Sequence, residues 1–242
     1  MDQELCALLK SRAESLGAGY FGIADLTLAK DAIAAQGGET IAGFPEAVTV
    51  GIDLPDPLVE MVPEAGTSAG ALLYHHHAYD VVNRELDSIA LHLSDMLQRR
   101  GYRALPIAAS LRTDKAGICG PISHKLVAGL AGLGWIGRSC LLVTPGHGPR
   151  VRFVTVLTDA PLKPTGTPVD SRCGSCMACV ETCPARAFTG RAFDRTEPRE
   201  ARFDAAACER YLESRRSESG VAVCGMCLWV CPHGRTPGTR SE

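Results

Sequence analysis

Cysteines crowd the C-terminal third of this chain. Eight of its 11 cysteines lie between residues 173 and 231. Four form a C-x-x-C-x-x-C-x-x-x-C-P run and three form a C-x-x-C-x-x-x-C-P run, while Cys208 lies between the two runs. The roughly 75 residues beyond residue 165 are too few for a large apolar core, so an inorganic centre held by these thiolates must stabilise the segment.

The spacing is typical of bacterial ferredoxins, in which the fourth cysteine of a run ligates the other of two 4Fe-4S clusters. This crossover predicts the ligands of cluster one, which are Cys173, Cys176, Cys179 and Cys231. Cluster two then takes the remaining thiolates, with Cys208 as the only other cysteine of the segment; its predicted ligands are Cys183, Cys208, Cys224 and Cys227. The pattern indicates electron transfer.

Disulfides and structural zinc are the two competing interpretations of the cysteines. Residues 1–10 (MDQELCALLK) do not resemble a signal peptide, which disfavours disulfides and predicts a cytoplasmic location. Zinc uses C-x-x-C pairs, but it does not explain the third cysteine at the same spacing or the Cys-Pro endings. We therefore expect two 4Fe-4S clusters.

Composition excludes several other classes of protein. No stretch approaches the ~20 uninterrupted apolar residues that a membrane span requires, so no membrane partner is expected. The 25 basic and 27 acidic residues give a net charge of -2. That balance disfavours an obligate nucleic-acid partner, although a local basic groove stays open.

The proline-rich residues 160–172 mark a predicted boundary between two domains, residues 1–165 and residues 166–242. The first reads as mixed α/β. Apolar spacing predicts helices over residues 2–16, from Val82 to Gly101, and over residues 123–132 with Ser123 as N-cap. Short strands are expected at residues 20–24, 47–52 and 104–108, and a hairpin is expected between residues 141–144 and 151–158.

Residues 121–137, PISHKLVAGLAGLGWIG, resemble the epoxyqueuosine reductase family. That family has a similar Pro-x-x-x-Lys start, then a helix, then the AGLGWIG motif. Its Thr-Asp-x-Pro-Leu motif is matched at residues 158–162, and its C-x-x-Y-L context is matched at Cys208. The resemblance runs from about residue 74 to residue 233.

The resemblance implies an α+β chain, with a nitroreductase-like α/β domain at residues 1–165 followed by a ferredoxin-like double-cluster domain at residues 166–242. It also implies a bound cobalamin, with flavin as the lesser alternative. An external low-potential donor would supply electrons through both clusters to cobalt, and an unidentified small molecule would be reduced. The residues implied to bind this cofactor are Lys125, Gly132, Gly134, Trp135, Ile136, Gly137 and Arg138.

Each of these residues also has a simpler interpretation. The alternative for the AGLGWIG motif is a tight corner between a helix and a strand, with Trp135 in the core. Lys125 reads as a solvated residue at a helix start, and Arg138 as a surface arginine rather than a contact to a cofactor phosphate.

The chain also departs from the family pattern. The family carries an acidic residue, expected to donate a proton, before a Tyr-His pair, whereas Ala78 stands before Tyr79 here and Asp80 follows. Residues 111–120 form an extra segment, and a helical-repeat extension that some members use toward tRNA is lacking. These departures disfavour tRNA as a partner and predict a divergent relative with a different substrate.

The candidate catalytic residues are His75, His77, Tyr79 and Cys119. In a strand, His75 and His77 would share a face and could donate protons near neutral pH. The alternatives are a polar loop for the histidine run, a helix cap for Asp80 and a small buried apolar role for Cys119. Two other functions stay open, namely an electron carrier that reactivates a corrinoid partner and a corrinoid-binding module without turnover.

Overall fold

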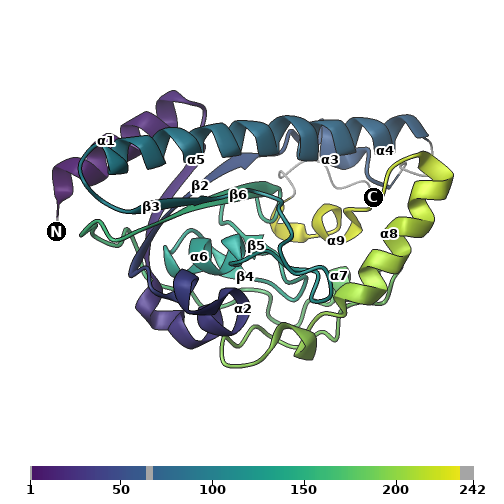
Figure 1. Cartoon of the computed structure of the whole chain (residues 1–242). Coiled ribbons are helices and arrows are strands. Elements are labelled where there is room, and N and C mark those ends of the chain that lie inside the picture. The colour runs from purple at the N-terminus through teal and green to yellow at the C-terminus, as the bar shows by residue number, and fades with distance from the viewer. Residues whose placement is uncertain (1, 64–67, 235–242) are drawn as a thin grey trace. The chain divides into compact units, whose positions relative to one another are not determined.

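A four-stranded sheet with the order β1-β2-β6-β3 organises the first of two structural units in the computed structural model (Figure 1). The strands are β1 Tyr20–Asp25, β2 Glu46–Asp53, β3 Ala104–Ile107 and β6 Val151–Thr158. β1 and β2 are antiparallel with Tyr20 opposite Gly51, and β3 and β6 are antiparallel with Ala104 opposite Thr158. The structure describes residues 2–63 and 68–234.

Four helices accompany this sheet: α1 Gln3–Ser15, α2 Lys30–Ala42, α5 Val82–Gln98 and α6 His124–Leu130. Helix α5 packs against α1 and β3, while α6 packs against β1. The apolar stripe of α5 explains this placement, because its spacing of three and four residues puts one face toward the sheet. The buried members of the stripe are Val82, Leu86, Ile89, Leu93 and Leu97.

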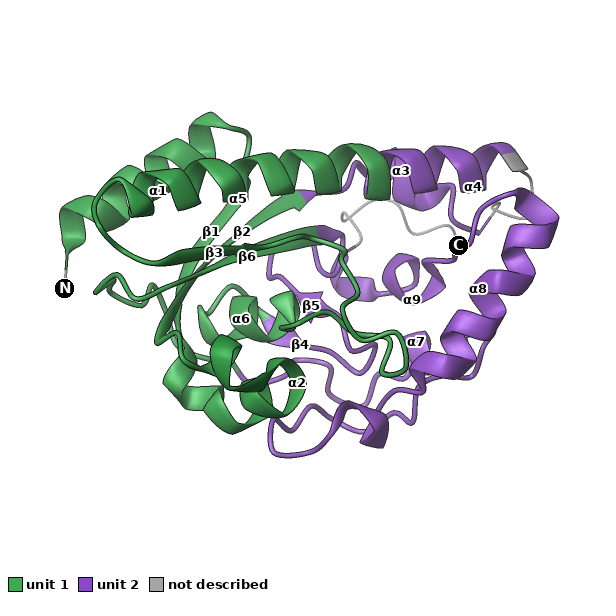
Figure 2. Ribbon diagram, viewed as in Figure 1, with its two compact units in different colours: residues 1–52, 79–134, 152–169 green, residues 53–78, 135–151, 170–242 purple. Residues whose placement is uncertain are grey.

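The second unit has little sheet and depends on short helices around the cysteine runs (Figure 2). A small hairpin joins β4 Trp135–Ile136 to β5 Leu142–Val143. The helices are α3 Asp56–Glu60, α4 Ser68–His75, α7 Ala178–Glu181, α8 Ala205–Ser219 and α9 Met226–Trp229. Helix α9 packs against α7 and α3, and α4 packs against α8. A π-helical turn, η2 His76–Val81, precedes α5.

The predicted helices and strands of the first unit are present, but the predicted hairpin between residues 141–144 and 151–158 is wrong. β5 pairs with β4, and β6 lies between β2 and β3. The intervening turn closes only on itself, through the bridge between Thr144 and Gly148. Short-range pattern cannot distinguish a hairpin from two neighbouring strands that pair elsewhere.

The compact units are not contiguous in sequence, unlike the predicted division at residues 165 and 166. The first unit contains residues 1–52, 79–134 and 152–169, and the second contains residues 53–78, 135–151 and 170–242 (Figure 2). Two segments of the predicted N-terminal domain therefore pack with the cysteine-rich segment. Among the described residues, no helix is both long and apolar enough to cross a membrane.

Candidate iron–sulfur and substrate sites

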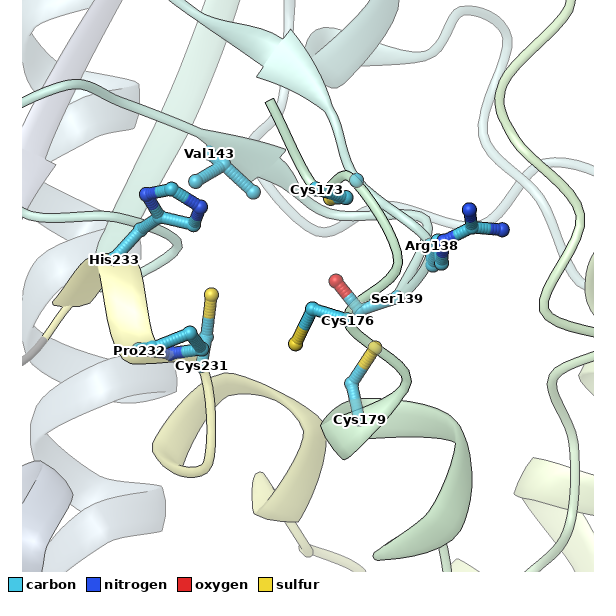
Figure 3. A pocket seen from close by; sticks show the side chains of 10 residues that line it. Arg138, Ser139, Val143, Cys173, Cys176, Cys179, Cys231, Pro232 and His233 are labelled. Carbon is cyan, nitrogen blue, oxygen red and sulfur yellow. The ribbon is translucent and has the colours of Figure 1, made fainter. Parts of the chain in front are cut away.

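Four cysteines from the two runs line one cavity in the second unit (Figure 3). Cys173, Cys176 and Cys179 come from the first run, and Cys231 follows α9 in the second. The remaining wall comes from the turn between β4 and β5, from β5 itself and from the residues after Cys231, namely Gly137, Arg138, Ser139, Val143, Pro232 and His233. The cavity thus brings together the four thiols that the crossover pattern assigns to cluster one.

The other four cysteines interact around Cys227. Burial raises the pKa of Cys227 most, and the neighbouring thiols of Cys224, Cys208 and Cys183 raise it further. Cys208 lies in the first turn of α8, where Asp204 fixes the helix start by accepting a hydrogen bond from the Ala207 amide at 2.8 Å. Helix α8 therefore carries Cys208 toward a group of thiols that belongs to both runs.

The chemistry of these donors fits clusters. Burial and the neighbouring Cys231, Cys173 and Cys176 raise the pKa of Cys179 to about 11. Converging thiols of this kind become thiolates when bound iron compensates their charge. A donor set spread around a cavity suits a cluster whose iron atoms each take one thiolate.

Arg138 holds the first cysteine run in place. Its Nη2 donates to the Gly174 carbonyl at 2.8 Å, and its Nη1 donates to the Gly190 carbonyl. Gly174 lies between Cys173 and Cys176 and has a positive φ of 52°. Arg138 is therefore not the simple surface arginine of the alternative interpretation, since it is a cation in the wall of the cysteine cavity. A contact between Arg138 and a cofactor phosphate stays a prediction.

We expect Arg138→Gln to make cluster one harder to reduce. Reduction adds a negative charge to the cluster, and the guanidinium favours that charge electrostatically. At a fixed potential, the ratio of reduced to oxidised cluster one should fall about tenfold, equivalent to ~59 mV for a one-electron couple. A redox titration followed by electron paramagnetic resonance (EPR) measures this ratio. Arg195→Gln removes an exposed arginine of the same unit and is the control; equal shifts in the two variants would contradict the assignment.

The glycines of the AGLGWIG motif have roles within the protein. Gly132 has a φ of 79°, and a Cβ there would lie 3.0 Å from the Thr167 carbonyl oxygen. A Cβ at Gly137 would lie 3.0 Å from Val143 and 3.5 Å from the Cys173 sulfur. Close packing thus explains these two glycines without a cofactor, while Gly134 is buried.

Trp135 is buried, as the core interpretation predicts, but its indole is incompletely satisfied. The side chain is 2% exposed, and its Nε1 has no hydrogen-bond partner among the described residues. Its ring meets the edge of His233 with centroids 5.0 Å apart. Ile136 follows it in β4. A buried N–H without a hydrogen-bond partner is uncommon in proteins. Among the side-chain atoms of the motif, Nε1 of Trp135 is therefore the candidate donor to a polar ligand.

The histidine run is helical, so both the strand and the loop interpretations are wrong. His75 ends α4, whereas His76 and His77 begin η2 with rings 5.4 Å apart. Helical geometry turns His75 and His77 away from a common face. The sequence did not predict this helical conformation, because three consecutive histidines have no helical period.

The neighbours of the histidine run are partly accounted for by packing. Ala78 is fully buried. The Arg152 guanidinium lies 4.3 Å from the Tyr79 ring centroid, and Arg152 also donates to Asn83 at 2.7 Å. Asp80 is not the predicted cap of α5, because Val81 holds the N-cap position without a side-chain hydrogen bond.

A second cavity, of about 310 Å³, lies wholly within the first unit. Cys119 and Lys125 both line it, so two predicted site residues meet there. Sequence reasoning missed Ser110 and Arg112 in the same wall. The only signal for them was the extra segment at residues 111–120, which forms much of this cavity.

His124 supports this cavity rather than acting as an acid. Its Nδ1 lies 2.8 Å from the Thr155 hydroxyl, and its Nε2 lies 3.1 Å from the Ala108 carbonyl oxygen. Burial is the main cause that lowers its pKa to about 4. The ring is therefore neutral at pH 7 and ties α6 to the sheet.

Residues 172–234 match the family model of the 4Fe-4S double cluster binding domain. The cysteine-rich segment is therefore a double-cluster iron–sulfur domain, attached to a mixed helix and sheet unit. This match agrees with the two thiol groups described above.

The wider chain is similar in sequence to epoxyqueuosine reductases. The enzyme of that name from Aliivibrio fischeri is 27% identical over 237 residues, covering 91% of this chain and 58% of the relative. The one from Listeria monocytogenes is 32% identical over 126 residues, covering 48% of this chain and 31% of the relative. The chain thus spans less than two thirds of the length of these relatives.

Solved structures show the same fold. A catabolic reductive dehalogenase, NpRdhA, matches with a TM-score of 0.66 at 21% identity, covering 96% of this chain and 32% of that one. An epoxyqueuosine reductase with an epoxyqueuosine-modified tRNA-Tyr stem loop matches with a TM-score of 0.58 at 22% identity, covering 96% and 65%. The predicted resemblance to epoxyqueuosine reductases is confirmed.

Proposed function

We propose that this chain is an iron–sulfur reductase that uses two 4Fe-4S clusters and a bound cobalamin to reduce a small molecule. The observation that carries the proposal is the cavity in which Cys231 of the second run joins three cysteines of the first. Clusters would supply electrons singly, and a corrinoid would supply a centre that accepts them for substrate reduction. The solved structures of similar fold include a reductive dehalogenase whose structure is described as suggesting a mechanism for B12-dependent dehalogenation.

The cluster ligands follow from the thiol groups. Cluster one would be held by Cys173, Cys176, Cys179 and Cys231, and cluster two by Cys183, Cys208, Cys224 and Cys227. Arg138 would orient the first of these sets through its hydrogen bond to Gly174. The first unit would be the nitroreductase-like part of the chain, with the second cavity as its substrate site.

Trp135 supports corrinoid binding. Its buried Nε1 is a donor without a partner among the described residues, and the amide carbonyls of a corrinoid would satisfy it. The predicted neighbours of Trp135 in the motif, Gly132, Gly134, Ile136, Gly137 and Arg138, would accompany it, whereas the predicted cofactor residue Lys125 lines the second cavity. Cys119 would be the proton donor of the substrate site, because its thiol lines the second cavity and histidine there is neutral.

We expect the anaerobically purified chain to bind hydroxocobalamin at about one per chain. Titration followed by the corrin absorption bands measures this binding. Trp135→Phe keeps the aromatic ring but removes the N–H, so its dissociation constant should rise about fivefold to tenfold for the loss of one hydrogen bond. Iron and sulfide analysis of the same samples establishes that the clusters are intact.

Three outcomes separate the alternatives. Binding followed by reduction of cobalt by the clusters supports the reductase. Absence of corrinoid binding with both clusters intact would overturn the proposal in favour of an electron carrier. Binding without electron transfer from reduced clusters would leave a corrinoid-binding module without turnover.

A further inference from the structure

We propose that the second cavity binds the anionic group, carboxylate or phosphate, of a small-molecule substrate. The inference rests on the proposed function and names the chemical class of molecule that would be reduced. The cavity is formed by residues 107–112 after β3 and by residues 118–125 leading into α6. Its volume of about 310 Å³ lies at the small end of ligand sites.

The charge of the lining points to an anion. Arg112 and Lys125 line the cavity, and within the described chain no carboxylate does. The two cations give the wall a formal charge of +2, because His124 is neutral at pH 7 with a pKa of about 4. The Ser110 hydroxyl adds a hydrogen-bond donor. A guanidinium and an ammonium group are the side chains that recognise carboxylates and phosphates.

Two carboxylates from segments next to the cavity accept hydrogen bonds from backbone amides. Asp87 accepts a hydrogen bond from the Ala109 amide at 2.8 Å, and Asp114 accepts one from the Gly117 amide at 2.9 Å. Neither side chain lines the cavity. Among the described residues, the lining itself therefore contains two cationic side chains and no carboxylate.

The extra segment is built to keep this wall in place. A bridge pairs Asp114 with Cys119, and Gln36 donates to the Gly120 carbonyl at 2.8 Å. Ile118 has a φ of 51°, which is strained for a β-branched residue. Such strain persists only where the surrounding structure fixes the backbone. The next residue along the chain, the half-buried Cys119, lines the cavity.

Cys119 provides a built-in reporter for a test on the holoprotein. Iodoacetate and iodoacetamide both alkylate a thiolate at the same carbon, forming an S–C bond and releasing iodide, but only iodoacetate is an anion. The ratio of their rates at Cys119, divided by the same ratio for glutathione, cancels any change in thiol pKa. Peptide mass spectrometry reads Cys119 separately from the other cysteines. We expect this normalised ratio to be about ten.

Matched variants test whether Arg112 and Lys125 cause the preference of Cys119 for iodoacetate over iodoacetamide. Arg112→Gln with Lys125→Gln should return the normalised ratio to about one, and each single variant should lower it. Arg84→Gln with Lys30→Gln changes the net charge equally at exposed positions of the same unit and should leave it near ten. Benzoate should protect Cys119 from both reagents, whereas the neutral benzamide should not.

Several results would overturn the inference. A normalised ratio near one in the wild-type protein would show that the cavity has no anion site. A ratio that stays near ten in the Arg112→Gln, Lys125→Gln double variant would show that these two residues do not form one. Loss of the iodoacetate preference after loading with hydroxocobalamin would assign the site to the cofactor phosphate instead of a substrate. If the wild-type protein binds no corrinoid but Cys119 still prefers iodoacetate, the proposed reductase is refuted and the anion site remains. The failure of the proposed function is therefore distinguishable from the failure of this inference.

Discussion

Replacing Cys208 with alanine should remove cluster two and leave cluster one. Cys208 lies outside both runs, yet its thiol is one of those that raise the pKa of Cys227. Without it, the second group has only three thiols: Cys183, Cys224 and Cys227. Anaerobic iron content should therefore fall from about eight to about four per chain, since each cubane contains four irons. The EPR signal of reduced cluster one should persist.

Cys6→Ala is the control for this experiment, because Cys6 lies in α1 of the first unit, away from both thiol groups in sequence. It should retain all of the iron. Full iron content in Cys208→Ala would show that another ligand completes cluster two. Loss of all eight irons would show that the two clusters form as one cooperative unit.

The sequence predicted those parts of the molecule that short-range pattern determines. The buried stripe on α5 follows from the spacing of its apolar residues. The grouping of cysteines was predictable because iron–sulfur ligation has a fixed spacing rule. In both cases the physical constraint acts within a few residues or through a known motif.

Contacts between distant segments were not predictable from the sequence. Arg138 reaches Gly174 and Gly190 across more than 30 residues, and no local pattern identifies carbonyl partners. Arg112 joins Lys125 only because the extra segment folds back through the bridge at Cys119. The failed hairpin has the same origin, because strand pairing depends on the whole sheet.

Arg150 is another long-range contact, and it supports the second cysteine run. The side chain is 1% exposed, and its guanidinium donates to Asp56 at 2.7 Å and to Glu60 at 2.6 Å. Glu60 also accepts a hydrogen bond from the Trp229 indole at 2.9 Å. Arg150 thereby fixes α3 to the end of α9, two residues before Cys231.

Arg150→Met should destabilise the second unit and loosen cluster one. Breaking a buried ion pair costs about 3–5 kcal/mol, but Asp56 and Glu60 are about two fifths exposed and can return to water. We therefore expect a loss of about 2 kcal/mol, which lowers Tm by about 4–8 °C in a chain of this size. Iron release to a chelator should accelerate, and cluster one should be lost before cluster two.

Arg216→Met is the matched control, because Arg216 is 59% exposed and forms an ion pair with Glu213 on the surface of α8. Surface pairs contribute under about 1 kcal/mol, so its Tm should stay close to that of the wild-type protein. Equal iron-release rates in the two variants would show that Arg150 does not support the cysteine run. If Arg150→Met lowers Tm and both clusters are lost at the same rate, then Arg150 stabilises the second unit as a whole. A local effect that runs from Arg150 through Trp229 to Cys231 would instead release cluster one first.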